Sequence, residues 1–249
     1  RLWTSPNTFV ASANCALYCG AGVDFVDIDP RTYNMSVVDL ESRLQRAEAQ
    51  GRLPKVVVAV HFAGQPCEMA SIGALAKRYG FAVIEDASQA IGASNGDAAV
   101  GSCVHSDITV FSFHPVKILT TGEGGMLLTN RADIDSRLRL LRSHGVTRDP
   151  SLMDEATHGP WYYQQVELGY NYRITDIQAA LGKSQLDRLD EFIARRRQLA
   201  RNYDELLGGL PVVLPWQRPA ANSAWHLYVI RVPGGGRRSR DEVFASLRE

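Results

Sequence analysis

With 249 residues, of which 45% are hydrophobic and 22% charged, the sequence is typical of a globular protein with one large domain and part of a second. The 27 basic and 27 acidic residues cancel, which argues against general nucleic-acid binding, and no apolar run approaches the ~18 residues of a membrane span. The four cysteines form no CxxC pair and the ligand spacing of a zinc site is absent, so we expect reduced thiols that mostly fill the core, a cytoplasmic protein and no metal.

The first third of the chain alternates β-rich runs with amphipathic segments. We expect strands at residues 1–4, 23–28, 55–62 and 81–84, and helices at 8–18, 37–50 and from Pro66 to 79. This alternation predicts βαβ units and a mainly parallel sheet. The continuous β-branched run KVVVAVHF is typical of a strand covered on both faces.

Ligands bind beyond the carboxyl ends of the strands in such sheets. His61, Asp86 and residues 111–125 all lie at or just after the carboxyl ends of β-rich runs, so we expect them to converge in space.

The rest of the chain gives a strand at 125–130, a helix at 132–142 and an aromatic-rich irregular stretch at 143–168. A long helix is predicted from Thr175 to about 206, followed by short strands in PVVLP and WHLYVIRV. We therefore divide the chain into a large domain, residues 1–186, and a linking helix with part of a smaller C-terminal domain, residues 187–249.

The segment FSFHPVKILTTGEGG, residues 111–125, contains one lysine, Lys117, among apolar neighbours and without an adjacent carboxylate. A lysine in a dry pocket loses its proton readily and its neutral amine attacks aldehydes, whereas the simpler interpretation is a surface loop lysine. The three glycines that follow allow a close approach to a ligand.

Other polar or aromatic residues could each have an ordinary structural role. Asp86 ends the strand FAVIED and could be a capping or turn aspartate, or could hold a proton on a heterocyclic nitrogen. Gln89, three residues on, could be a solvated loop residue or could bind a phenolic oxygen. Ser112 could donate to a phosphate, Phe9 could stack on a ring or lie in the core, and Asn171 could contact a ligand or a second subunit or form a turn. Their joint arrangement with Lys117 is more specific than any single residue.

Five collinear stretches together resemble the DegT/DnrJ/StrS family of nucleotide-sugar aminotransferases, which are pyridoxal-phosphate enzymes of fold type I. They are SPNTFVASANCALYCGAGVDFVDID, VHFAGQPCEM, VIEDASQAIGAS, FSFHPVKILTTGEGG and LGYNYRITDIQAALG. The stretches RSHGVTRDP, GPWYYQQVELGYNYRITD and SAWHLYVIRV most resemble the subgroup that aminates C4 of a UDP-4-keto-6-deoxy-N-acetylhexosamine on the route to pseudaminic acid.

This resemblance implies an α/β fold with a mainly parallel seven-stranded-type sheet, helices on both faces and a small C-terminal α+β domain. It implies pyridoxal 5'-phosphate as cofactor, L-glutamate as amino donor, a UDP-linked keto-sugar as acceptor and a homodimer. It implies that Lys117 binds the cofactor covalently and later moves a proton between substrate and cofactor. It implies that Asp86 pairs with the pyridinium nitrogen, that Gln89 bonds the phenolic oxygen and that Ser112 binds the phosphate. Phe9 would stack on the cofactor ring, and Asn171 would contact the phosphate of the cofactor in the neighbouring subunit. His61 and His114 are expected near the cofactor without an assigned role.

The family's NGT-type phosphate-binding segment is expected upstream of Arg1, and most of the sugar-shaping C-terminal domain beyond Glu249. Three alternatives stay open: an aminotransferase for another UDP-, GDP- or dTDP-linked keto-sugar, a dehydratase on the same scaffold, and a non-catalytic regulatory relic that binds the cofactor. Lys117 argues against the dehydratase, because family members that eliminate water replace this lysine with histidine.

Overall fold

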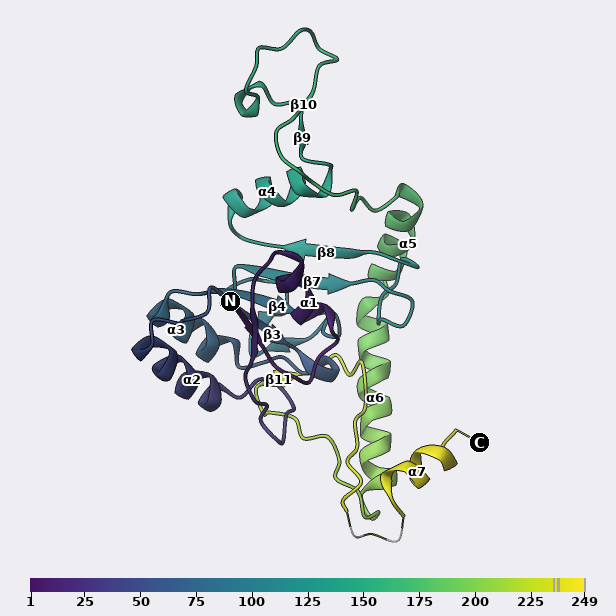
Figure 1. Ribbon diagram of the computed structural model, residues 1–249. Coiled ribbons are helices and arrows are strands. Elements are labelled where there is room, and N and C mark those ends of the chain that lie inside the picture. Colours follow the sequence, from purple (N-terminus) through teal and green to yellow (C-terminus); the bar gives the residue numbers. More distant parts are fainter. Residues whose placement is uncertain (235, 237, 249) are drawn as a thin grey trace.

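The computed structural model describes residues 1–234, 236 and 238–248, and its centre is one six-stranded sheet (Figure 1). The strand order is β2-β1-β3-β4-β7-β8, and all neighbours are parallel except β7 and β8. The strands are β1 (Leu2–Thr4), β2 (Val23–Phe25), β3 (Val56–Val60), β4 (Ala82–Asp86), β7 (Ile108–Ser112) and β8 (Gly125–Leu128). The predicted α/β fold with a mainly parallel sheet is confirmed.

The described part of the chain contains seven α-helices. They are α1 (Ala11–Tyr18), α2 (Val37–Ala49), α3 (Met69–Tyr79), α4 (Ala132–Arg142), α5 (Asp176–Leu186), α6 (Leu189–Leu207) and α7 (Arg240–Ser246). Two short 3-10 helices, η1 (Phe62–Gly64) and η2 (Pro150–Leu152), and short strands complete the described elements: β5 (Ser94–Asn95), β6 (Ala98–Ala99), β9 (Val146–Thr147), β10 (Gln164–Gln165) and β11 (Ala221–Asn222).

Alternation along the strands builds a core on each face of the sheet. Val57 and Val83 pack with Leu40 of α2 and Ile72 of α3, whereas the next residue along β3, Val58, packs on the opposite face with Ala16 of α1. A third cluster, which includes Phe111, Ile118, Ile193 and Ala224, connects the sheet to α6. In Figure 1, α6 runs past the edge of the sheet, and the β9–β10 hairpin projects beyond α4.

Pro66 does not begin a helix as predicted, because α3 begins only at Met69. The backbone around Pro66 has tertiary partners instead. Asn34 Nδ2 donates to the Gln65 carbonyl at 2.9 Å, and the Cys67 N–H donates to His61 Nδ1 at 3.1 Å. Contacts distant in sequence therefore override the local helix signal.

The predicted long helix is two helices, α5 and α6, separated at Asp187 and Arg188. The break lets each helix pack on a different partner. Gln185 of α5 forms hydrogen bonds with the backbone of Thr120. Ile193 of α6 packs closely against Gly92, where an added Cβ atom would lie 2.8 Å from Ile193 Cγ1.

The predicted strands in PVVLP and WHLYVIRV are also wrong. In the described residues of these two stretches, the pairing is limited to one isolated β-bridge between Val213 and Arg231. The backbone of this region bonds η1 instead: Ala224 N–H donates to the Gly64 carbonyl at 3.0 Å and Leu227 N–H to the Ala63 carbonyl at 3.2 Å.

No helix in the described part of the chain has both the length and the apolar character needed to cross a membrane. Of the cysteines, Cys67 and Cys103 are buried as expected, but Cys15 and Cys19 are exposed on and just after α1.

Candidate active site

The register of the sheet places Asp86 and Ser112 on the same face. Asp86 is paired with Val110 in the β4–β7 ladder, and Ser112 is two residues further along β7, so their side chains point the same way. This is the face that α1 covers. Both residues end their strands, where ligands of parallel sheets bind.

The Asp86 carboxylate is oriented by two donors. Ser12 of α1 donates through Oγ to Oδ2 at 2.6 Å, and the Ser88 backbone N–H donates to Oδ1 at 3.1 Å. Ser12 is itself buried and shares a 2.9 Å hydrogen bond with the Thr8 hydroxyl. These bonds fix the position of the carboxylate, as an anion that pairs with a cationic ring nitrogen requires.

Lys117 lies half-buried in the loop that follows β7. Burial lowers the pKa of its amine, and the Asp86 carboxylate partly opposes this shift, so the net pKa lies below the ordinary value. Lys117 and Asp86 therefore lie close enough to influence each other electrostatically. A partly dehydrated amine beside a fixed carboxylate can react as a nucleophile and can carry a proton.

The Lys117 loop is fixed by its own threonines. Thr120 donates through its hydroxyl to the Phe113 carbonyl at 2.9 Å, and Thr121 donates to the same carbonyl through its backbone N–H at 2.9 Å. Gly124 has φ +156°, and a Cβ there would overlap the Thr121 hydroxyl. The glycine allows the close approach that closes the loop.

Gln89 is oriented by the backbone of η1. Its Oε1 accepts from the Ala63 N–H at 2.7 Å, which fixes the amide so that Oε1 is used and Nε2 is the free donor. Among the described residues, Nε2 has no hydrogen-bond acceptor. The geometry thus leaves the amide nitrogen of Gln89 available as a donor to a ligand.

The other candidates lie at the surface. Ser112 Oγ accepts from the His114 N–H at 3.4 Å, and His114 is half-exposed with Nε2 3.9 Å from Glu123. Phe9 has 75% of its surface exposed rather than lying in the core. Asn171 is exposed and bridges Ser143 through the backbone, and no described contact brings it to Asp86.

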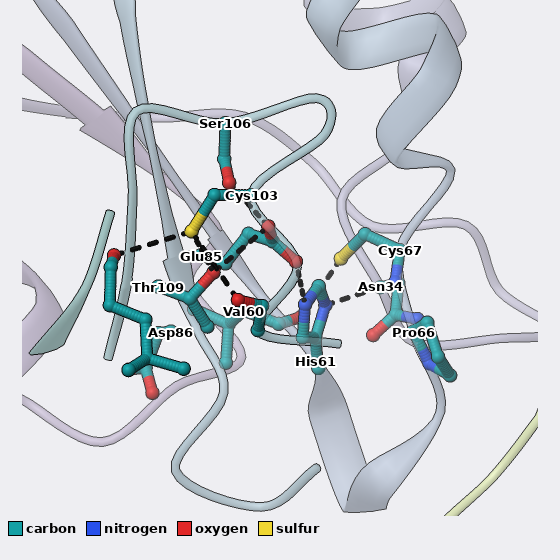
Figure 2. Close-up of polar contacts among 12 residues, drawn as sticks. Asn34, Val60, His61, Pro66, Cys67, Glu85, Asp86, Cys103, Ser106 and Thr109 are labelled. Atoms are coloured by element: carbon teal, nitrogen blue, oxygen red, sulfur yellow. Dashed lines mark hydrogen bonds and ion pairs between the residues drawn. The ribbon is translucent and has the colours of Figure 1, made fainter. Parts of the chain in front are cut away.

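The structure places the His61 ring away from this site, contrary to expectation. Glu85 and Asp86 are adjacent on β4 and so point to opposite faces, and His61 bonds Glu85, with 2.8 Å between Nε2 and Oε2 (Figure 2). The ring is fully buried in the core on the α2–α3 side. The backbone of His61 follows β3 as predicted, but strand parity decides where the side chain points.

Two polar side chains that the sequence did not mark belong to this neighbourhood. Ser12 lies in a helix of small residues and carries no local signal of its contact with Asp86. His226 lies in a stretch that was predicted to be a strand, and its pKa responds to the charge of Lys117. Both are brought to the site by tertiary packing.

These residues fit pyridoxal phosphate at its ring. Asp86 offers a fixed anion, Gln89 a free N–H donor, Ser112 a hydroxyl and Lys117 a partly dehydrated amine. Those are the groups that a protonated ring nitrogen, a phenolic oxygen, a phosphate and an aldehyde require.

Residues 2–249 match the DegT/DnrJ/EryC1/StrS aminotransferase family. The chain is 37% identical over 246 residues to the UDP-4-amino-4,6-dideoxy-N-acetyl-beta-L-altrosamine transaminase of Campylobacter jejuni. The aligned residues cover 98% of this chain and 61% of that relative. It is 38% identical over 242 residues to the GDP-perosamine synthase of Caulobacter vibrioides, and the aligned residues cover 96% of this chain and 60% of that relative. The chain therefore spans about three fifths of the length of these relatives.

Solved structures agree with the sequence match. Helicobacter pylori PseC, described as an aminotransferase involved in the biosynthesis of pseudoaminic acid, superposes with a TM-score of 0.86 at 28% identity, over 99% of this chain and 62% of PseC. The PLP form of the putative sugar aminotransferase Spr1654 from Streptococcus pneumoniae superposes with a TM-score of 0.82 at 26% identity, over 99% of this chain and 64% of that one. Aminotransferases of this family depend on pyridoxal phosphate. By its sequence match, fold and site, the chain belongs to the DegT/DnrJ/EryC1/StrS aminotransferase family.

Proposed function

We propose that the complete protein transfers an amino group from L-glutamate to C4 of a UDP-4-keto-6-deoxy-N-acetylhexosamine, with pyridoxal 5'-phosphate as cofactor. The observation that best supports this is the position of Lys117 in a loop at the strand end where Asp86 lies, within electrostatic influence of the Asp86 carboxylate. The amine is half-buried with a lowered pKa, and its strongest charged influence is the Asp86 carboxylate.

The roles of the individual residues follow from their surroundings. Pyridoxal phosphate, when bound, supplies an electron sink for the reacting carbon. Asp86, fixed by Ser12, would keep the ring nitrogen protonated, and Gln89 would donate through Nε2 to the phenolic oxygen. Lys117 would bind the cofactor covalently and, once released, move the proton at the substrate carbon. Its lowered pKa favours both tasks because both need the neutral amine.

The remaining cofactor contacts are proposed for Ser112, Phe9 and Asn171. Ser112 would donate to the phosphate from the end of β7. Phe9, with its exposed ring just before α1, would pack against the flat face of the cofactor. Asn171 would reach the phosphate bound by a second copy of the chain, which makes a homodimer the active unit.

The nucleotide is the least constrained part of the proposal. The UDP-sugar transaminase and the GDP-perosamine synthase are 37% and 38% identical to the chain, so identity does not separate a UDP-sugar from a GDP-sugar acceptor. The UDP-linked substrate, and with it a place in pseudaminic acid biosynthesis, is proposed because of the sequence stretches that resemble that subgroup.

We also propose a domain division at the α5–α6 break, with residues 1–186 in the cofactor-binding domain and 187–249 leading into a smaller one. The break at Asp187 and Arg188 lies at this division and supports it. A cytoplasmic location, where nucleotide sugars are made and thiols stay reduced, completes the proposal.

The first experiment tests the site. The complete protein is loaded with pyridoxal phosphate, reduced with borohydride and digested, and the pyridoxyl group is located by mass spectrometry. We expect it on Lys117, and we expect Lys117→Ala to lose the absorbance of the lysine-bound cofactor. A label on another lysine would refute the assignment.

The second experiment tests the reaction. The complete protein is given L-glutamate alone, and 2-oxoglutarate is measured, before a panel of UDP-, GDP- and dTDP-linked 4-keto-sugars is added. We expect 2-oxoglutarate in the first stage and an amino sugar from the UDP-linked 4-keto-6-deoxy-N-acetylhexosamine in the second. Product without 2-oxoglutarate would indicate a dehydratase, and cofactor binding without either product would indicate a non-catalytic relic.

A further inference from the structure

The backbone of η1 contains an alanine in a conformation that favours glycine. Ala63 has φ 58° and ψ 4°, which is the left-handed region, where a Cβ atom costs free energy. In this conformation its N–H donates to Gln89 Oε1 at 2.7 Å, and its carbonyl accepts from the Leu227 N–H at 3.2 Å. Strained backbone of this kind persists only where the surrounding structure over-determines it, and it is concentrated at ligand sites.

The side chain of Asn34 holds η1 from both sides. Its Oδ1 accepts from the Phe62 N–H at 2.9 Å, and its Nδ2 donates to the Gln65 carbonyl at 2.9 Å. One carboxamide thus bonds the backbone before and after Ala63. Asn34 has only 4% of its surface exposed, so both bonds are shielded from water. One backbone partner is a donor and the other an acceptor, which fixes the orientation of the amide.

Asn34 is itself fixed by a tight turn from Asp29 to Asn34. Asp29 Oδ1 accepts from the backbone N–H groups of Arg31 and Thr32, each at 2.9 Å. The Asp29 N–H donates to the Asn34 carbonyl at 2.9 Å, and Tyr33 within the turn is also left-handed, with φ 62°. The turn therefore gives the Asn34 side chain a fixed base.

We propose that Asn34 is a positioning residue of the active site, which acts on the bound cofactor through η1 and Gln89. This inference rests on the cofactor contact proposed for Gln89. With Asn34 in place, the Ala63 N–H occupies Gln89 Oε1, so the amide offers Nε2 to the ligand. Without Asn34, Ala63 is free to leave the left-handed region, and the Gln89 amide loses the partner that fixes its orientation.

The orientation of Gln89 affects a property of the cofactor that is measured without turnover. A donor to the phenolic oxygen stabilises that oxygen as an anion after the nitrogen that joins Lys117 to the cofactor has lost its proton. The donor therefore lowers the pKa of this nitrogen, and a misdirected Gln89 raises it. The absorbance of the lysine-bound cofactor over a pH series gives the midpoint of this titration.

The first test compares variants of the complete protein loaded with pyridoxal phosphate. We expect Gln89→Ala to raise the midpoint by about one pH unit, the effect of one hydrogen bond to a charged group, and Asn34→Ala to raise it by about half a unit. Asn34→Ala added to Gln89→Ala should give no further shift, because the effects of two residues that act through one another do not add.

The second test needs no cofactor. Hydrogen exchange at the Ala63 amide of the complete, cofactor-free protein measures how firmly its bond to Gln89 is held. We expect Asn34→Ala to speed this exchange about tenfold.

Asn130→Ala is the matched control for both tests. Asn130 Nδ2 donates to the Ser102 and Cys103 carbonyls at 2.8 and 3.4 Å, and Asn130 follows β8, at the opposite end of the sheet from Asp86. Its loss should change neither the midpoint nor the exchange at Ala63.

A midpoint that shifts in Gln89→Ala but not in Asn34→Ala would overturn the inference. A further shift in the double variant, or an unchanged exchange rate at Ala63, would overturn it too. If Asn34→Ala does not fold, Asn34→Ser, which also lacks the carboxamide, is judged by the same outcomes.

Failure of the proposed function gives a different result. A midpoint that does not move in Gln89→Ala would refute the cofactor contact proposed for Gln89, and this inference with it. Absence of pyridoxal phosphate from Lys117 in the wild-type protein would refute the proposed function, whereas the exchange at Ala63 would still decide whether Asn34 fixes Gln89.

Discussion

Glu85 and Asp86 are adjacent on β4, but their carboxylates face opposite sides of the sheet and have different environments. Asp86 faces α1 and the Lys117 loop. Glu85 is buried among three donors: His61 Nε2 at 2.8 Å, the Ser106 hydroxyl at 2.5 Å and the Thr109 hydroxyl at 3.1 Å (Figure 2). Strand parity thus separates a carboxylate available to a ligand from one that stabilises the core.

The bond from Ser12 to Asp86 leads to a prediction about cofactor affinity. Ser12→Ala removes a 2.6 Å bond to a charged acceptor, which is worth about 1.5–3 kcal/mol. We expect the complete protein to bind pyridoxal phosphate roughly 10- to 100-fold more weakly, measured by titration of the absorbance of the bound cofactor.

Ser106→Ala is the control for this change, because it removes an equivalent bond to Glu85 on the other face. It should lower the free energy of unfolding without weakening cofactor binding. Equal cofactor affinity in the Ser12 and Ser106 variants would contradict the role of Ser12.

The buried Glu85 leads to a prediction about pH. Burial raises the pKa of Glu85, but its hydrogen bonds outweigh this and leave the pKa below the ordinary value. A depressed folded-state pKa contributes stability above the unfolded pKa, about 4.3, and that stability is lost as the pH falls below it. Glu85→Gln should therefore cost about 1–3 kcal/mol at pH 7, and the difference from wild type should shrink below about pH 4.

Denaturant unfolding of the complete protein at several pH values measures this difference. The exposed Glu48→Gln is the control and should leave the free energy of unfolding almost unchanged at every pH. A difference that stays constant with pH would show that the Glu85 carboxylate does not have the lowered pKa.

At the scale of elements, one face of α5 fixes the loop that carries Lys117. Gln185 accepts from the Thr120 N–H at 3.2 Å and donates to the Thr120 carbonyl at 2.8 Å, and Gln178, two turns earlier, donates to the Glu123 carbonyl at 3.0 Å. Gly182 lies between them, and a Cβ there would be 2.8 Å from Thr121 Cγ2. The helix approaches the loop closely because this residue has no side chain.

This contact predicts that Gln185→Ala loosens the Lys117 loop. Loss of the two hydrogen bonds from the Gln185 side chain to the Thr120 backbone should lower the free energy of unfolding by about 1–2 kcal/mol and speed the release of pyridoxal phosphate from the complete protein. Gln198→Ala, on the exposed side of α6, also removes two hydrogen bonds, to the side chains of Asn202 and Arg201, but away from the Lys117 loop, and should leave both quantities almost unchanged. Similar release rates in both variants would show that α5 does not position the loop.

At the scale of the whole molecule, the region around Asn171 exposes large apolar side chains. Leu168 and Ile177 each have 85% of their surface exposed, and Tyr172 has 73%. Exposed apolar patches of this kind mark interaction surfaces. They support the proposed dimer, in which Asn171 of one copy serves the site of the other.

A hybrid dimer tests this arrangement. A complete protein with Lys117→Ala is mixed and refolded with one that carries Asn171→Ala. If Asn171 acts on the neighbouring subunit, the hybrid has one site with both native residues, and about half of the wild-type activity per hybrid should return although each parent is impaired. Hybrids no more active than the parents would show that Asn171 serves its own subunit or neither.

Much of the fold could be predicted from local pattern. The residues of β1, β3, β4 and α4 were predicted from β-rich runs and helical spacing. Asp86, Ser112 and Lys117 were candidates because each follows a predicted strand, and the structure brings them to one end of the sheet. Their roles stay predictions.

The errors share a physical cause. His61 was expected beside the cofactor, yet its ring bonds Glu85, and Ser12 and His226 carried no signal in the sequence. The side chains of His61 and Ser12 bond partners 24 and 74 residues away along the chain, and the backbone carbonyl of His226 accepts from Arg196, 30 residues away.

The sequence by itself determined the parallel sheet, the types of the elements that build it and the family, because hydrophobic periodicity and collinear motifs are properties of neighbouring residues. The tertiary structure alone decided three things: the face to which each strand-end side chain points, the break between α5 and α6, and the docking of residues 223–227 on η1. Those outcomes depend on close packing and on hydrogen bonds between distant segments, which a local pattern does not encode.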